Sequence, residues 1–215
     1  MIFHDRHDAG IQLASKLQKY AKAKNTLVLG LARGGVVVAY EVAKALELPL
    51  NVIVVRKIGA PGNEELAVGA VTEKGEGTFN ENLITILGVS SDYLKREVEK
   101  EKRLAGARGA LYRGDSPPLE VKDKTLILVD DGIATGASVK AAIKSLKGES
   151  PHKIILAIPL AAPDSLRALQ KEVDETVCLS TPSYFEAVGS FYKFFDQTSD
   201  QEIVSLLKSS KVCGI

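Results

Sequence analysis

Four short runs of consecutive apolar residues place the strongest constraint on what this chain can fold into. Each run is continuous rather than alternating, which is typical of a β-strand covered on both faces of a sheet. The runs occupy residues 27–31, 51–55, 125–129 and 154–158, and a weaker candidate lies at 176–180. In a chain of 215 residues, these strands predict one domain with a sizeable core.

Helical stretches fill most intervals between these runs. Asp8 is the expected cap of a first helix, and residues 35–46, 136–146 and 163–173 show helical patterns. Strands that alternate with helices pair in parallel through right-handed crossovers. We therefore expect an α/β fold, with an open, mainly parallel sheet flanked by helices, in a single domain over residues 1–215.

Two segments interrupt this alternation. Residues 57–80 are rich in glycine and contain Pro61, so we expect a flexible loop there. Residues 91–113 predict a long charged helix, capped by Ser91 or Asp92 and inserted into the domain. Its mixed Lys, Arg and Glu residues favour a solvated face held by ion pairs between residues four positions apart.

The nearly neutral net charge of the chain favours a local binding site for a small molecule over a large charged surface. Lys and Arg number 28 and Asp and Glu 27, a net charge of +1, so we expect no nucleic acid or membrane partner. The two cysteines lack the spacing of metal ligands. The sequence shows no signal-peptide pattern and no apolar run of the ~18 residues that a membrane span needs, so we expect a cytoplasmic protein.

The segment 126–138 carries the clearest chemical signal. An apolar strand ends in two carboxylates, Asp130 and Asp131, and a short turn leads into a helix. Open α/β sheets bind ligands at the carboxyl ends of their strands, and the start of a helix presents free N–H groups to an anion. The residues that would form this anion site are Ala134, Thr135, Gly136, Ala137 and Ser138.

The acidic pair and the anion site together indicate one kind of ligand. Two carboxylates would repel a phosphate, so they are expected to face sugar hydroxyls or an accompanying divalent cation. A phosphorylated sugar meets both requirements, whereas the glycine patterns of P-loop and dinucleotide-binding proteins are absent. The simpler alternative is a buried strand whose aspartates only cap a turn.

The segment 126–138 resembles the phosphoribosyl pyrophosphate signature of the type I phosphoribosyltransferases. The resemblance implies that family's fold, with Asp130 and Asp131 as the catalytic pair beside the ribose hydroxyls and residues 134–138 around the 5′-phosphate. It implies Mg²⁺ as cofactor, held mainly by ligand oxygens, with Asp130 and Asp131 as candidate protein ligands. Gly132 departs from the pattern, because many members carry an aliphatic residue there.

Two shorter segments fit the same resemblance. Arg33, Gly34 and Gly35 follow the first strand and resemble the family's pyrophosphate-binding loop, which often contains a cis peptide without proline. Glycines let such a loop direct several N–H groups at one anion. Arg56 and Lys57 stand where the family's mobile loop begins and are candidate pyrophosphate ligands, with a solvated basic pair as the alternative.

Aromatic residues near the end of the chain complete the resemblance. Residues 183–195 resemble the hood that covers the nucleobase in this family, and we expect the hood to occupy about residues 180–215. Phe185 is the candidate for stacking on the base, and the alternative is that these aromatic side chains are core. Purine-salvage members usually carry an acidic residue where this chain has Ala134 and another near Lys193, and both are missing here, which argues against an ordinary hypoxanthine–guanine activity.

The resemblance implies an enzyme, a glycosyltransferase of the phosphoribosyltransferase type. It would use phosphoribosyl pyrophosphate and Mg²⁺ to ribosylate a nitrogenous base in nucleotide metabolism, releasing pyrophosphate. The alternative, motivated by Ala134, is a regulator or sensor that binds phosphoribosyl pyrophosphate with little catalysis. The acceptor base and the oligomeric state stay open, with a homodimer as one option.

Overall fold

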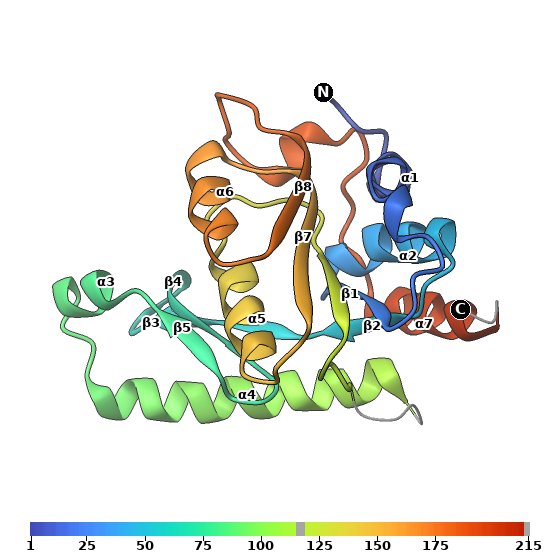
Figure 1. Cartoon of the computed structure of the whole chain (residues 1–215). Coiled ribbons are helices and arrows are strands. Elements are labelled where there is room, and N and C mark those ends of the chain that lie inside the picture. Colours follow the sequence, from blue (N-terminus) through green and yellow to red (C-terminus); the bar gives the residue numbers. More distant parts are fainter. Residues whose placement is uncertain (115–118, 213–215) are drawn as a thin grey trace.

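A parallel β-sheet forms the centre of the structure, a computed structural model that describes residues 1–114 and 119–212 (Figure 1). The described strands of this sheet lie in the order β2–β1–β6–β7–β8, and every neighbouring pair is parallel. Their bounds are β1 Thr26–Leu31, β2 Leu50–Ile53, β6 Thr125–Val129, β7 Lys153–Leu160 and β8 Glu175–Ser180. The expected open parallel sheet is confirmed, including its weaker strand at 176–180.

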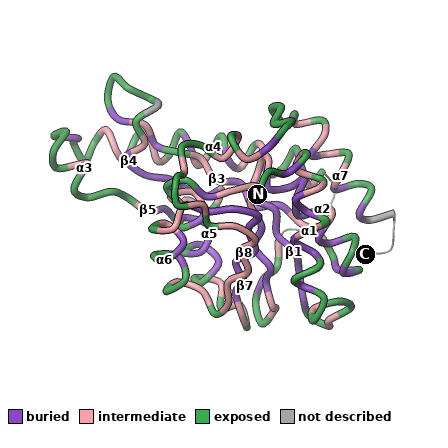
Figure 2. Tube along the Cα trace, turned by 90° about the horizontal axis from the view of Figure 1, so that it is seen from above, coloured by how far each residue is buried: buried purple, intermediate pink, exposed green. Residues whose placement is uncertain are grey.

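Helices cover both faces of this sheet, which explains the continuous apolar runs. Ile127 packs with α1 and α2 on one face, and its neighbour Leu128 packs with α5 and α6 on the other. Successive strand residues point to opposite faces, so both sets must be apolar, and Figure 2 shows buried residues running along the strands. The covering helices are α1 Arg6–Lys16, α2 Gly34–Leu46, α5 Ala137–Lys147 and α6 Pro163–Gln170.

The first helix begins earlier than the sequence predicts. Its cap is Asp5 rather than Asp8, because the Asp5 carboxylate accepts a hydrogen bond of 2.9 Å from the backbone N–H of Asp8. Asp8 lies in the first turn, where a negative charge suits the positive end of the helix dipole. The earlier start makes Arg6 the first residue of α1, and a short 3₁₀ helix, Gln18–Tyr20, follows α1.

The prediction of a loop at residues 57–80 is wrong. The segment forms a second, antiparallel sheet of β3 (Val55–Ala60), β4 (Asn63–Thr72) and β5 (Gly77–Phe79). Its apolar residues, among them the fully buried Ile58, pack against α3 (Glu81–Ile86) and α4 (Ser91–Arg113). The glycines permit close approach of strands, since a Cβ on Gly77 would lie 2.5 Å from the Ala70 carbonyl oxygen.

The long charged helix is confirmed as α4, which runs beneath the second sheet (Figure 1). Its cap is Ser90, whose hydroxyl accepts from the backbone N–H of Tyr93, rather than Ser91 or Asp92. Part of its charge is turned inward and is not solvated as expected: Glu101 is buried and accepts a hydrogen bond from Arg56 of β3. These contacts hold α4 against the second sheet.

The segment predicted to be the hood contains two different parts. Residues 181–199 are irregular apart from a 3₁₀ helix, Val188–Phe191, and α7 (Asp200–Val212) follows them. Helix α7 packs against α2, α4 and β2, at the far end of the sheet from β8 (Figure 1). The part that can cover a ligand is therefore 181–199, while residues 213–215 of the expected hood lie outside the described residues.

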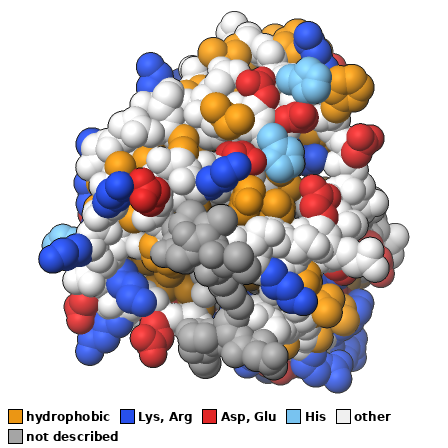
Figure 3. Space-filling model, turned by 90° about the vertical axis from the view of Figure 1, so that its right-hand side faces the viewer, with side chains coloured by type: hydrophobic (Ala, Val, Ile, Leu, Met, Phe, Trp, Pro, Cys, Tyr) orange, Lys and Arg blue, Asp and Glu red, His pale blue; other side chains and the backbone are white. Residues whose placement is uncertain are grey.

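The surface around α1, α2 and α7 carries both signs of charge. Figure 3 shows basic and acidic side chains interspersed with apolar ones on that side. Within residues 1–114 and 119–212, no helix combines the length and the apolar character needed to cross a bilayer.

If residues 57–80 form a packed sheet, removing a buried side chain from it should destabilise the protein, which would not be expected of a loop. Ile58→Ala should lower the free energy of unfolding by about 2–5 kcal/mol, because it leaves a cavity in a packed cluster. Ile86→Ala is the matched control, since Ile86 is 79% exposed and should change stability by only about 0.5 kcal/mol. Urea denaturation of both variants measures this difference, and equal, small effects would contradict the sheet.

Candidate active site

Parallel pairing of β1 with β6 brings the two predicted ligand-binding loops together. The strands end side by side, with Gly30 opposite Val129, so the loop after β1 meets the acidic pair after β6. A Cβ on Gly34 would lie 2.0 Å from Oδ2 of Asp131, and one on Gly35 would lie 2.8 Å from the Cα of Asp130. Only glycines allow this approach, and the peptide bond between Ala32 and Arg33 is cis.

A cavity of about 190 Å³ lies over the loop that follows β6. Its lining includes Asp130, all of residues 134–138, Lys57 and Val188. Gly136 has φ +75° and caps α5, a conformation that favours glycine. The first N–H groups of a helix lack intrahelical partners, so the start of α5 offers several donors to an anion at this cavity.

Two hydrogen bonds fix the shape of this loop. The backbone N–H of Ile133 donates to the carbonyl of Leu160 at 3.0 Å, which extends the sheet beyond β6. The hydroxyl of Ser165 donates to the carbonyl of Ala134 at 2.6 Å, which ties the loop to α6. The donors at the start of α5 are therefore held in place before any ligand arrives.

Asp130 is the carboxylate that faces the cavity. Burial at the end of β6 raises the pKa of Asp130 well above its usual value, and the neighbouring charge of Asp131 raises it further. Its Oδ1 accepts a hydrogen bond of 2.9 Å from the backbone N–H of Asp131, which opposes that rise. A partly buried carboxylate that resists ionisation is suited to a ligand that brings positive charge or hydroxyl donors.

Asp131 is held from two sides and does not line the cavity. Its Oδ2 accepts a hydrogen bond of 2.7 Å from Nε of Arg6, and the two side chains are only 15% and 12% exposed. Its backbone carbonyl accepts from the hydroxyl of Tyr192 at 2.6 Å. Sequence reasoning missed Arg6 and Tyr192, because each meets Asp131 only through the tertiary fold.

The two adjacent basic residues of β3 have different surroundings. Lys57 lines the cavity over the loop that follows β6 and a second cavity of about 620 Å³ beside it. Arg56 lies on the opposite face of the strand, where it is paired with Glu101 of α4, because successive strand residues alternate. Arg33 extends toward α7, with Nη1 4.0 Å from Oδ1 of Asp200. The structure therefore brings Lys57, but not Arg56 or the Arg33 side chain, to the cavity.

The hood contributes Val188 rather than Phe185 to the cavity. A Cβ on Gly132 would lie 2.6 Å from Cγ1 of Val188, so glycine at this position makes room for the valine. Phe185 is half-buried, 5.2 Å from the ring of Phe191, and packs on a cluster that contains Phe3. The Phe185 side chain thus packs among core residues, which is the alternative to stacking on a base.

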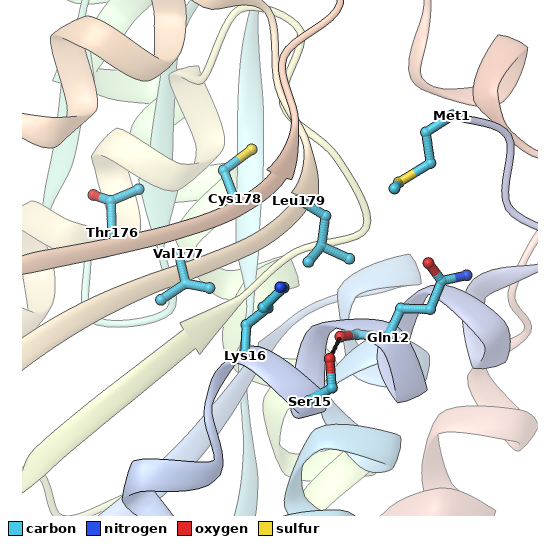
Figure 4. A pocket seen from close by; sticks show the side chains of 8 residues that line it. All are labelled: Met1, Gln12, Ser15, Lys16, Thr176, Val177, Cys178 and Leu179. Atoms are coloured by element: carbon cyan, nitrogen blue, oxygen red, sulfur yellow. Dashed lines mark hydrogen bonds between the residues drawn. The ribbon is translucent and has the colours of Figure 1, made fainter.

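A separate cavity of about 540 Å³ lies between α1 and the edge strand β8 (Figure 4). Its lining includes Lys16 and Cys178 and shares no residue with the loop after β6. Burial raises the pKa of the Cys178 thiol, whose Sγ donates to the carbonyl of Ser180, so this cysteine is not an activated nucleophile. The acidic pair and residues 134–138 remain the candidate site.

The described residues contain no cluster of three or more His, Cys, Asp and Glu side chains that could hold a metal ion. Asp130 can supply one carboxylate oxygen at the cavity, whereas Asp131 is paired with Arg6. Hard cations such as Mg²⁺ accept one or two carboxylates and complete their coordination with water and phosphate oxygens. The residues present therefore fit an ion that a phosphorylated ligand brings with it.

The parallel sheet and the two loops at its carboxyl edge define an α/β protein of the type I phosphoribosyltransferase class. A family model described as "Phosphoribosyl transferase domain" matches residues 3–196, and the chain belongs to this family of pentosyltransferases.

The chain is also similar to two named relatives and to one solved structure. It is 41% identical over 208 residues to a Mycobacterium tuberculosis protein named "Putative phosphoribosyl transferase Rv0571c", covering 96% of this chain but 46% of that protein. The chain thus spans about half the length of that curated relative. A "Uracil phosphoribosyltransferase" of Methanococcus maripaludis is 22% identical, with 77% of this chain and 72% of that protein covered. The crystal structure of TT1426 from Thermus thermophilus is 40% identical, with a TM-score of 0.81 over 97% of this chain and 99% of that chain.

The raised pKa of Asp130 predicts that this carboxylate costs stability. The Asp130 carboxyl keeps its proton to higher pH in the folded state than in the unfolded state. The free energy of unfolding therefore falls as the pH rises from the usual pKa of Asp toward the raised pKa of Asp130. Asp130→Asn should therefore unfold at a higher temperature than the wild type at pH 7, and the difference should vanish in acid.

Asp131→Asn is the matched control for this prediction. It removes the charged partner of Arg6 and should lower the free energy of unfolding by about 1.5–3 kcal/mol. Calorimetric melting of both variants from pH 3 to pH 8 measures the two effects. Destabilisation of Asp130→Asn at pH 7 would show that this carboxylate is not buried at a cost.

Proposed function

We propose that the protein transfers the phosphoribosyl group of phosphoribosyl pyrophosphate to a nitrogen atom of a small base, with Mg²⁺ as cofactor. The observation that carries the proposal is that Asp130, Lys57 and the start of α5 line one cavity. An anion cradle, a cation and a carboxylate within one small space suit a ligand with phosphate at both ends and a sugar between them. Family membership supports the same reaction class.

Each part of the donor has a matching group at the site. The 5′-phosphate is bound by backbone N–H groups and hydroxyls of residues 134–138. The ribose hydroxyls donate to the acidic pair, with Asp130 on the cavity side. The pyrophosphate lies toward Lys57 and the loop of Gly34 and Gly35. There the Lys57 ammonium and backbone N–H groups donate hydrogen bonds to the pyrophosphate oxygens.

Mg²⁺, when bound, would add positive charge to the pyrophosphate and so favour its departure. Asp130 is the residue at the cavity that would contact the ion, and the ligand's own oxygens would supply most of the remaining contacts. The protein's part is then to position C1 of the donor next to the nitrogen atom of the acceptor.

The chemistry requires charge stabilisation rather than a covalent nucleophile. The bond between C1 and the pyrophosphate oxygen breaks with its electron pair leaving on oxygen, and the base nitrogen forms the new bond to C1. The ribose gains oxocarbenium character on the way. This forming positive charge favours the ionised form of Asp130, and the Asp130 carboxylate stabilises it in turn. Ala134 cannot accept the proton of the base, so that proton leaves to water or to the released pyrophosphate.

The acceptor is proposed to be a small base bound under the hood. Val188 supplies an apolar wall beside Gly132, and the missing carboxylate at Ala134 disfavours a 6-oxopurine. The distant relative from Methanococcus maripaludis is named for uracil, so uracil is the first base to test. A regulator that binds the donor without turnover is the second candidate, favoured by Ala134 alone.

A screen of free bases separates these two candidates. The protein is incubated with phosphoribosyl pyrophosphate, Mg²⁺ and each base, and released pyrophosphate is measured. We expect release with at least one base, and Asp130→Asn should lower its rate on the order of 100-fold. Donor binding without release with any base would favour the regulator, and no donor binding would contradict both.

The neighbours Lys57 and Arg56 provide a matched pair of variants. Lys57→Ala should weaken binding of phosphoribosyl pyrophosphate by about tenfold or more, because a charge-assisted contact to the ligand is lost. Arg56→Ala should leave the affinity within about twofold, since its side chain pairs with Glu101, but should lower the free energy of unfolding by about 1–3 kcal/mol. Calorimetric titration and urea denaturation test both, and the reverse pattern would exclude this division of roles.

A further inference from the structure

We propose that Arg6 is a positioning residue that fixes Asp131 beside the ribose-binding site and couples it to the hood; this inference rests on the proposed function. Arg6 comes from the first turn of α1, more than a hundred residues from Asp131 in sequence. Its Nε donates to Oδ2 of Asp131 at 2.7 Å, and its Nη1 donates to the carbonyl of Asp196 at 2.7 Å. One planar guanidinium thus bridges the acidic pair and the hood.

The place of Arg6 in its helix is unfavourable for an arginine. A cation at the first residue of a helix opposes the positive end of the helix dipole. The cost is offset by contacts outside the helix, because the guanidinium carbon lies 3.8 Å from the centre of the Phe195 ring and the side chain is only 12% exposed. Contacts with Asp131, Asp196 and Phe195, rather than the position of Arg6 in α1, therefore stabilise its side chain.

The backbone around Arg6 is joined to the hood as well. The N–H of Phe3 donates to the carbonyl of Phe191 at 2.9 Å, and the N–H of Lys193 donates to the carbonyl of Phe3 at 2.9 Å. The N–H of Phe194 donates to the carbonyl of His4 at 3.0 Å. Residues 3–4 and 191–194 thus form a short paired strap that includes Tyr192 and leads into Arg6, the two residues that hold Asp131.

This strap gives the two aspartates separate tasks. Asp131 has its charge matched by Arg6 and its carbonyl held by Tyr192, so its carboxylate is fixed in direction. Asp130 lines the cavity and is the partner left to the incoming ligand. Gly34 lies within contact of both Arg6 and Asp131, so the same arrangement also sets the position of the pyrophosphate loop.

A double-mutant cycle on ligand affinity tests this role. Arg6→Gln, Asp131→Asn and the double variant are titrated with phosphoribosyl pyrophosphate in the presence of Mg²⁺, and with ribose 5-phosphate. Arg6→Gln should weaken both affinities by about tenfold. Because Arg6 acts through Asp131, the double variant should lose little more than either single variant. Arg103→Gln is the control, since Arg103 is an exposed arginine of α4, and it should stay within about twofold.

The outcomes separate the positioning role from the proposed function. Additive losses would mean that Arg6 only stabilises the fold and would overturn the inference, as would unchanged affinity in a folded Arg6→Gln protein. If Arg6→Gln does not fold, Arg6→Lys takes its place in the cycle, because it keeps the cation and loses the planar fork. A wild-type protein that binds neither ligand would contradict the proposed function itself.

Discussion

The parallel pairing of β1 with β6 is the contact on which the rest of the structure depends. It places the ends of two central strands side by side, so the glycines after one strand meet the aspartates after the other. The continuous apolar runs exist because this sheet is covered on both faces. That burial leaves the strand ends as the place where polar groups can gather without entering the core. Residues 134–138 and Asp130 line one cavity for this reason.

The segment before α1 and the hood complete this edge. The segment before α1 pairs with the hood, and together they bring Arg6 and Tyr192 onto Asp131. The second sheet adds Lys57 from another direction, while α4 supports that sheet through Glu101 and its apolar contacts. A site assembled from five separate parts of the chain combines anion donors, the cations Lys57 and Arg6, and a carboxylate that is costly to ionise. Such a preorganised arrangement suits charge stabilisation more than covalent chemistry.

The sequence predicted the parts of this structure that depend on local pattern. The parallel sheet, its helices and the juxtaposition of Gly34 and Gly35 with the acidic pair follow from apolar runs and short motifs. The second sheet was predicted as a loop, because its glycines were interpreted as turn residues although they serve close strand packing. Arg6 and the separate surroundings of Arg56 and Lys57 could not be predicted, because they are set by contacts between distant segments.

We propose that one ligand with phosphate at both ends of a ribose occupies the edge formed by β1 and β6. A crystal structure of the wild-type protein with phosphoribosyl pyrophosphate and Mg²⁺ tests this most directly. We expect the 5′-phosphate against the backbone N–H groups of residues 134–138, the ribose hydroxyls toward Asp130 and the pyrophosphate near Lys57. The same ligand bound in the cavity between α1 and β8, or a 5′-phosphate placed away from the start of α5, would contradict it.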